Sequence, residues 1–371
     1  MSDVQRMHDR FVRLCEIASP TGEERAIADA VAVELGELGV DFTEDDSAER
    51  AEAGSGNLIA RIPGRTDRWV AFTAHLDTVP HEGPIEVELE NGVFRSRGET
   101  ILGADNKAAV TVLMELAARH AGEPSACGIE LVFTTAEEDG LRGAKALDLE
   151  SLRSPVGFVL DHATDIGEVI ETAPTYLRLI AKFEGVEAHS GVNPEDGHSA
   201  IEAAAAAITR MELGRLDAET TANVGMIEGG TASNVVARSC SILAEARSID
   251  AERTAKEIGR MIDACTWAAT EGGCDVDTQV IEIFRGYRVD PKSEAVRLAL
   301  AGLKRCGIEP SLVSTGGGSD ANAFMVSGWD CVLLANGTFA NHTPQETVPA
   351  ANLDRMLEVC EAVIAVAGEG E

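Results

Sequence analysis

Four short runs of consecutive apolar residues recur along the chain, and none shows the alternation of a half-exposed strand. The runs are WVAFTA (69–74), IELVFTTA (129–136), VGFVL (156–160) and CVLLA (331–335). Strands that are apolar on both faces are typical of a sheet covered by helices on both sides. A segment with a helical pattern, NKAAVTVLMELAARH (106–120), lies between the first two runs. The pattern therefore predicts a layered α/β domain with a central sheet.

The middle of the chain has a different pattern, in which short strand-like and longer helix-like segments follow one another. The segments are strand-like at 176–184, 221–228, 240–249 and 275–284 and helix-like at 199–211 and 252–272. The order βαββαβ is that of a ferredoxin-like unit, with helices on an antiparallel sheet. We therefore expect an inserted domain of residues 176–285 within a domain formed by residues 1–175 and 286–371.

The N-terminal region has the pattern of two helices joined by SPTGEE (19–24). In this link Thr21 is followed three residues later by Glu24, which has the form of a capping box. The sequence therefore predicts that these two side chains cap the start of the second helix.

The charge of the chain narrows the classes of partner. There are 63 acidic and 31 basic residues among 371, which gives a formal net charge of −32. Phosphate backbones and anionic lipids repel such a chain, whereas nucleic-acid-binding proteins usually carry a basic stripe. No run approaches the ~20 apolar residues that a membrane span needs. We expect no nucleic-acid partner and no membrane association.

The eight cysteines are scattered, mostly in apolar surroundings, and none forms a CxxC motif. This usage is typical of reduced thiols in the cytosol. The N-terminus also lacks the long apolar core of a secretory signal. We therefore expect a cytoplasmic protein.

Acidic and imidazole side chains stand where the apolar runs end. They are His75 and Asp77 after the first run, Glu137 and Glu138 after the second, Asp161 after the third, His342 beyond the fourth, and Asp105 before the helix at 106. In open α/β sheets, ligands bind beyond the carboxyl ends of the strands. One such residue is more often an ordinary turn residue, but the repetition at five places predicts a common site.

Three carboxylates and two imidazoles at one point would repel one another and raise the carboxylate pKa values. Two Zn²⁺ ions would remove the repulsion, because their charge of +4 meets −3 from Asp105, Glu138 and Asp161. The number of candidate ligands also suits two ions. Each ion would have one histidine and one carboxylate, and the third carboxylate would bridge the two ions. Such pairs lie roughly 3.5–4 Å apart and activate a shared water. Zn²⁺ suits these ligands, with Mn²⁺ and Co²⁺ as alternatives.

Motifs along nearly the whole chain resemble those of the dinuclear-zinc peptidases and deacylases, a family that includes peptidase T, glutamate carboxypeptidase, succinyl-diaminopimelate desuccinylase and aminoacylase. The motifs are SPTGEE (19–24), GNLIARIPG (56–64), HLDTVP (75–80), LGADNKAAV (102–110), TTAEEDGLRGA (134–144), LDH (160–162), GVEAHSGVNPEDG (185–197), GGTASNVV (229–236), TGGGSDANAF (315–324) and NHTPQE (341–346). GGGSDAN and HTPQE are most similar to the peptidase T-like branch.

The resemblance implies a role for each residue at the strand ends. His75 and Asp161 would bind one zinc and Glu138 and His342 the other, with Asp105 as the bridge and a cis peptide bond at Asp105–Asn106. Asp77 would accept a hydrogen bond from His75 and so fix its tautomer. Glu137 would act as the general base.

The resemblance also assigns the inserted domain a role as lid and dimerisation domain. In a homodimer, His189 would reach the partner subunit's site and help to polarise the scissile carbonyl; the alternative is a structural role at the end of the sheet. Asn234 and Arg247 match substrate-binding residues, and Gly318 lies in a glycine-rich loop that would approach the substrate.

The resemblance, together with these residues, implies a zinc-dependent hydrolase of amide bonds that acts on short peptides, in the manner of a tripeptide aminopeptidase. One alternative is a deacylase that acts on an N-acylated amino acid or another non-peptidic amide. The other is a metal-binding protein without turnover.

Overall fold

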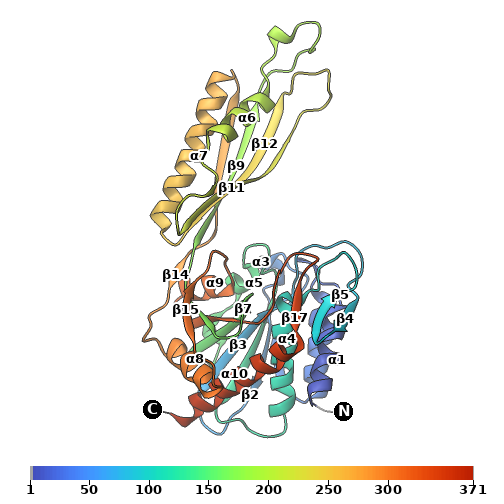
Figure 1. Ribbon diagram of the computed structural model, residues 1–371, viewed down its shortest axis with the longest axis vertical. Coiled ribbons are helices and arrows are strands. Elements are labelled where there is room, and N and C mark those ends of the chain that lie inside the picture. Colours follow the sequence, from blue (N-terminus) through green and yellow to red (C-terminus); the bar gives the residue numbers. More distant parts are fainter. Residues whose placement is uncertain (1–2, 371) are drawn as a thin grey trace. The chain divides into compact units, whose positions relative to one another are not determined.

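The structure is a computed structural model that describes residues 3–370, and it consists of two compact units (Figure 1). The first unit contains a nine-stranded sheet and a small three-stranded sheet, and the second contains a five-stranded sheet. The first unit comprises the chain up to Glu171, the segment Arg288–Ser314 and the chain from Ser319 onward. The second comprises Thr172–Tyr287 and the short segment Thr315–Gly318. None of the helices in residues 3–370 combines the length and the apolar character that a membrane span requires.

The first unit alternates strands and helices. Its helices are α1 (Asp3–Cys15), α2 (Arg25–Glu37), α3 (Ala48–Ala51), α4 (Ala104–His120), α5 (Arg142–Ala146), α8 (Glu294–Arg305), α9 (Asp320–Val326) and α10 (Ala350–Glu369). Its strands are β1 (Asp41–Glu44), β2 (Leu58–Ile62), β3 (Trp69–His75), β4 (Val87–Glu90), β5 (Val93–Ser96), β6 (Gly128–Thr134), β7 (Val156–His162), β15 (Ser311–Ser314), β16 (Asp330–Ala335) and β17 (Thr347–Pro349). The strands β8 (Glu168–Ala173) and β14 (Tyr287–Arg288) carry the chain between the units.

The four predicted apolar runs form the centre of a nine-stranded mixed sheet. The strand order is β1-β2-β6-β3-β7-β16-β8-β14, with β15 paired to β8. The neighbours β6, β3, β7 and β16 are parallel, whereas β2 and β8 run antiparallel to the strands beside them. Because parallel neighbours point the same way, the carboxyl ends of these four strands meet at one edge of the sheet. The predicted α/β class with a mixed central sheet is confirmed.

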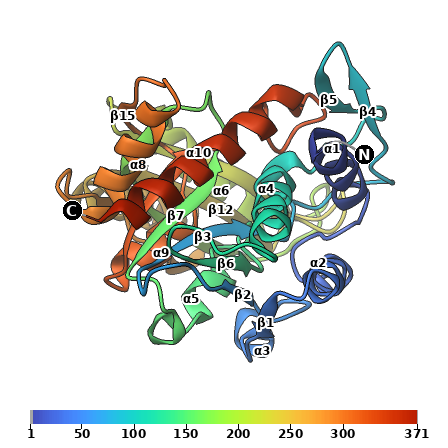
Figure 2. The ribbon, with the colours of Figure 1, turned by 90° about the horizontal axis from the view of Figure 1, so that it is seen from below.

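Helices cover both faces of this sheet, which explains why its central strands are apolar throughout. α8, α10 and α4 lie in a row along one face, and α9 and α5 lie along the other (Figure 2). α4 is buried over most of its length and packs on β3. The first residues of α4 therefore lie at the edge of the sheet where the four parallel strands end.

The second unit is a five-stranded antiparallel sheet with two helices. Its elements are β9 (Thr175–Glu184), α6 (Ala200–Arg210), β10 (Gly214–Arg215), β11 (Thr220–Gly229), β12 (Ser239–Ser248), α7 (Ala251–Glu271) and β13 (Asp275–Phe284). The strand order is β10-β11-β12-β9-β13. Buried residues alternate with partly exposed ones along β12, and α6 and α7 cover the face with the buried residues.

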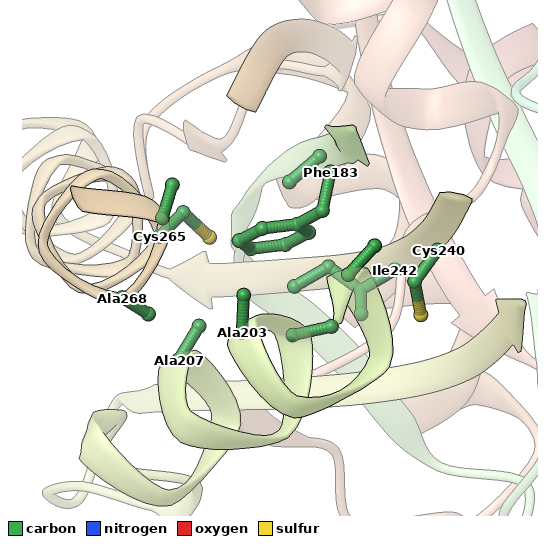
Figure 3. Close-up of a cluster of buried hydrophobic side chains, with 11 residues drawn as sticks. Phe183, Ala203, Ala207, Cys240, Ile242, Cys265 and Ala268 are labelled. Carbon is green, nitrogen blue, oxygen red and sulfur yellow. The ribbon is translucent and has the colours of Figure 1, made fainter. Parts of the chain in front are cut away.

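One cluster of the core of the second unit is built from small side chains around one phenylalanine. Figure 3 shows Phe183 of β9 between Cys265 of α7 and Ala203 of α6, with Ile242 of β12 beside it. The alanines that α6 presents to the core allow this helix to lie close to α7 and to the sheet. A core of this kind is self-contained, as expected for an inserted unit.

The capping box predicted at Thr21 and Glu24 is wrong. Glu24 is the N-cap residue of α2, and no side chain caps this helix. Thr21 Oγ1 instead donates a hydrogen bond to Asp77 Oδ2 over 2.7 Å. Glu24 is buried and accepts hydrogen bonds from the backbone N–H groups of Gly22, Gly54 and Ala136. The Thr21 hydroxyl is thus used as a donor to Asp77, and the Glu24 carboxylate as the acceptor of buried loop N–H groups, which need a partner inside the protein.

Candidate metal centre

Three adjacent parallel strands deliver four of the predicted site residues to one edge of the central sheet. His75 is the last residue of β3, and Asp161 lies near the end of β7. Glu137 and Glu138 follow β6, which pairs with β3 so that His75 lies opposite Thr134. The parallel register is thus the reason why residues distant in sequence lie together.

The Asp105 carboxylate lies between two imidazoles. Asp105 is the second residue of α4, and its Oδ1 lies 3.2 Å from His75 Nε2. Its Oδ2 lies 3.1 Å from Nε2 of His342, which comes from the loop between β16 and β17. Each oxygen of one carboxylate therefore faces a different histidine.

Each of these imidazoles also faces a second carboxylate. His75 Nε2 lies 3.5 Å from Asp161 Oδ1. His342 Nε2 lies 3.0 Å from Glu138 Oε1. Two similar groups result, each with one imidazole and one carboxylate, and both share Asp105.

The donor set and its spacing fit a pair of divalent ions. Two donors that each lie about 2.1 Å from one tetrahedral zinc ion are about 3.4 Å apart. The four N···O distances of 3.0–3.5 Å are of this size. Donor atoms of two triplets also lie within 4.8 Å of one another: His75, Asp105 and Glu138 form one triplet, and His75, Glu137 and Asp161 the other. This set of donors therefore fits a dinuclear metal site.

The electrostatics of the site follow from burial and from the opposed charges. Burial raises the pKa of Asp161 to about 8, and burial together with nearby carboxylates raises the pKa of Glu137 well above its usual value. Burial also raises the pKa of Asp105, but hydrogen bonds from His342 and His75 outweigh it and leave this pKa below its usual value. Hydrogen bonds to Asp105 and Glu138 raise the pKa of His342 to about 10. A positive charge is therefore favoured between these carboxylates.

Asp77 fixes both the first histidine and the segment that carries the two glutamates. His75 Nδ1 lies 2.9 Å from the backbone carbonyl of Asp77 and 3.4 Å from its carboxylate Oδ1. Asp77 Oδ1 accepts the Glu137 N–H over 2.9 Å, and Oδ2 accepts the Glu138 N–H over 3.1 Å. Burial acts to raise the pKa of Asp77, but these hydrogen bonds and His75 leave it below its usual value. The backbone carbonyl of Asp77 thus makes the shorter contact with His75, and its ionised carboxylate holds the loop after β6.

The loops that carry the glutamates and His342 have unusual backbone geometry. Ala136, which precedes Glu137, has φ of +49°, and His342 has φ of +64°. Residues other than glycine rarely adopt positive φ, and such conformations are often found at functional sites. The peptide bond Asp105–Asn106 is cis, as the family resemblance implied.

The residues predicted to bind substrate all belong to the second unit. His189 and Asn234 are exposed and lie on adjacent segments, joined by a 3.1 Å hydrogen bond from the Ser190 N–H to the Asn234 carbonyl. Arg247 pairs with Glu245 through two hydrogen bonds of 3.1 Å and stacks on the Tyr176 ring.

Gly318 packs against the ring of Phe284, which an added Cβ atom would approach to 2.2 Å. This contact is one reason why residues 315–318 join the second unit, although they lie far from it in sequence.

Several buried polar residues around the site were not singled out from the sequence. Glu346 accepts three backbone N–H groups near Asp105, and Asn106 Nδ2 donates to Asp161 Oδ1 over 3.1 Å. Asp320 is buried and accepts a hydrogen bond from the Thr134 hydroxyl. Glu346 and Asp320 lie in motifs that carry the family resemblance, HTPQE and GGGSDAN, but the motifs do not show which groups these side chains contact.

The chain is similar to known peptidases over its whole length. Residues 175–272 match the M20 peptidase dimerisation domain, and residues 57–172 match peptidase family M28. The uncharacterised protein YqjE of Bacillus subtilis is 37% identical over 367 residues, which cover 98% of this chain and 99% of that protein.

Two solved structures extend the similarity to the fold. Aminopeptidase PepT from Bacillus cereus has a TM-score of 0.84 and 37% identity, with 98% of each chain covered. A tripeptidase from Staphylococcus aureus has a TM-score of 0.90 and 32% identity, with 99% of each chain covered. The chain therefore belongs to the family of dinuclear metallopeptidases that includes peptidase T.

Replacing Asp77 with Asn should loosen the Glu137–Glu138 segment. The side-chain amide has one acceptor oxygen in place of two, so one buried N–H group loses its acceptor, which costs about 1–3 kcal/mol. Chemical denaturation should show this loss, and amide hydrogen exchange should accelerate across residues 134–141. Thr21→Val is the matched control, because it removes a hydroxyl donor to Asp77 and leaves both N–H acceptors in place. Unchanged exchange across 134–141 in Asp77→Asn would contradict this role.

Proposed function

We propose that this protein is a dinuclear, metal-dependent aminopeptidase that acts on short peptides. The observation that carries the proposal is the Asp105 carboxylate, whose oxygens lie 3.2 Å from His75 Nε2 and 3.1 Å from His342 Nε2. Two ions that share this carboxylate would each have one imidazole and one further carboxylate. Peptide substrates are supported by the names of the two solved relatives, an aminopeptidase and a tripeptidase.

Five side chains are the proposed metal ligands. His75 and Asp161 would hold one ion, Glu138 and His342 the other, and Asp105 would bridge them. Zinc is the proposed metal, because imidazole and carboxylate donors suit it, with Mn²⁺ and Co²⁺ as alternatives. When bound, the pair would polarise the scissile carbonyl and activate a water molecule.

Glu137 is the proposed general base. One of its carboxylate oxygens lies within 4.8 Å of donor atoms of His75 and Asp161. Its backbone N–H is held by Asp77, so its position is fixed independently of the substrate. From there the carboxylate would take a proton from the attacking water and give it to the nitrogen of the leaving amine.

The inserted segment is the proposed lid and dimerisation domain, with residues 176–285 in this role and residues 1–175 and 286–371 as the catalytic domain. Support comes from the match of residues 175–272 to a peptidase dimerisation domain. We propose a homodimer on this basis. The proposed compartment is the cytoplasm, because all eight cysteines are free thiols, as is usual in a reducing environment.

His189 is the proposed residue that each subunit supplies to its partner. Its Nδ1 accepts a hydrogen bond from the Gly191 N–H over 3.2 Å. The neutral ring then carries its proton on Nε2, which can donate to a substrate carbonyl oxygen. Asn234, Arg247 and Gly318 are the further proposed substrate-binding residues.

The proposed function can be tested with one substrate panel and a metal determination. Purified protein should contain about two divalent ions per chain. It should hydrolyse tripeptides with a free amino group faster than N-acylated amino acids, and a chelator should abolish this activity. Faster hydrolysis of the acylated substrates would instead indicate a deacylase, and bound metal without hydrolysis would indicate a metal-binding protein.

A pair of adjacent variants supplies the control for the roles within the site. Glu137→Gln should keep both ions but lose several orders of magnitude in turnover, because an amide cannot take the proton. Glu138→Gln, in contrast, should lose bound metal in addition to turnover. Loss of metal from Glu137→Gln would show that Glu137 is a ligand, as its place beside His75 and Asp161 also allows.

Mixing two inactive variants should restore activity if His189 acts across the dimer. His189→Ala should lower turnover and leave the metal content intact, since His189 is not a proposed ligand. In a mixed dimer of His189→Ala and Glu137→Gln chains, one of the two sites contains both wild-type groups. Subunit exchange should therefore recover part of the activity. A monomer in light scattering, or no recovery after exchange, would contradict the role in trans.

A further inference from the structure

Glu346 is a buried carboxylate whose partners are backbone N–H groups next to the metal centre. It lies four residues after His342, on the same loop, and is only 1% exposed. Its Oε2 accepts the N–H groups of Leu102 and Gly103, each over 2.8 Å, and its Oε1 accepts that of Asp105 over 2.8 Å. Both carboxylate oxygens are thus used by one short segment.

This segment sets the position of the bridging carboxylate. Gly103 has φ of +73°, and Asp105 and Asn106 depart from helical geometry although they lie at the start of α4. The first N–H groups of a helix have no acceptor within the helix, and that of Asp105, the second residue of α4, is one of them. The N–H groups of Leu102, Gly103 and Asp105 donate to the Glu346 carboxylate instead. Burial raises the pKa of Glu346 to about 7, and these three hydrogen bonds oppose that rise. They therefore favour the ionised carboxylate, whose hydrogen bonds are the stronger ones.

We propose that Glu346 is a positioning residue for the metal pair. By holding the backbone of Leu102–Asp105, it keeps one oxygen of Asp105 toward His75 and the other toward His342. Because His342 and Glu346 share a loop, the same carboxylate also fixes the His342 loop against the start of α4. This inference rests on the proposed function, since it takes Asp105 and His342 as metal ligands.

The variant Glu346→Gln tests the inference with almost no change of shape. The amide has one acceptor oxygen and one NH₂ group, so either Asp105 or the pair Leu102 and Gly103 loses its acceptor. Residues that orient metal ligands typically contribute 10-fold to 100-fold to metal affinity, so the zinc dissociation constant should rise by about that factor. The measurement is a competition titration of metal-free protein with a chromophoric chelator.

The control is Glu130→Gln in β6, which also weakens the 3.0 Å ion pair between Glu130 Oε1 and Arg61 Nε. Glu130 is also buried, and its Oε2 accepts the N–H groups of Arg153 and Ser154 over 2.8 and 2.7 Å. It lies toward the start of the strand, whereas Glu137 and Glu138 follow the strand's end. Glu130→Gln should lower thermal stability and leave zinc affinity unchanged. An unchanged zinc affinity in Glu346→Gln, with stability lowered as in the control, would overturn the inference.

A measurement on the wild-type protein tests the inference even if Glu346→Gln does not fold. Amide hydrogen exchange of the metal-free protein should already be slow at Leu102, Gly103 and Asp105, because Glu346 accepts these three N–H groups without metal. The inference would be overturned if these amides exchanged in the metal-free protein as fast as in an unfolded chain and became protected only after zinc was added. A wild-type protein that binds two ions but hydrolyses no peptide would contradict the proposed function, and the inference would still be supported by weaker zinc binding in Glu346→Gln. A wild-type protein that binds no ion pair would overturn both.

Discussion

The two oxygens of the Asp105 carboxylate, each directed at a different imidazole, are the constraint on which the rest of the site depends. His75 ends the central strand β3, and His342 lies in the loop after β16. Both imidazoles reach the Asp105 carboxylate only if the register of the sheet and the start of α4 are correctly formed. The apolar, parallel centre of the sheet provides this register. The central sheet and the site are therefore consequences of the same packing.

Buried carboxylates that accept backbone N–H groups hold the segments around this centre. Asp77 holds Glu137 and Glu138, Glu24 holds Ala136 just before them, and Glu346 holds the segment up to Asp105. An isolated buried carboxylate is costly, whereas two or three N–H donors stabilise its charged form. Irregular loops, including one with positive φ at Ala136, can thus be kept in one conformation without regular secondary structure.

The sequence predicted the central strands and the gathering of polar residues at their ends, because continuous apolar runs mark buried strands and their last residues can be read directly. It did not predict the partners of the supporting residues. Thr21 and Glu24 matched a capping box, yet they bind Asp77 and three loop N–H groups. Which buried N–H group lacks an acceptor depends on the path of loops that are distant in sequence. The same holds for residues 315–318, whose glycines show a need for close approach but not that Phe284 is the neighbour.

The most direct test of the central role of Asp105 is anomalous X-ray diffraction at the zinc absorption edge from crystals of the metal-loaded protein. Two peaks roughly 3.5–4 Å apart are expected, one beside each oxygen of the Asp105 carboxylate. One peak should lie next to His75 and Asp161, and the other next to His342 and Glu138. A single peak, or two peaks of which only one contacts Asp105, would contradict the account.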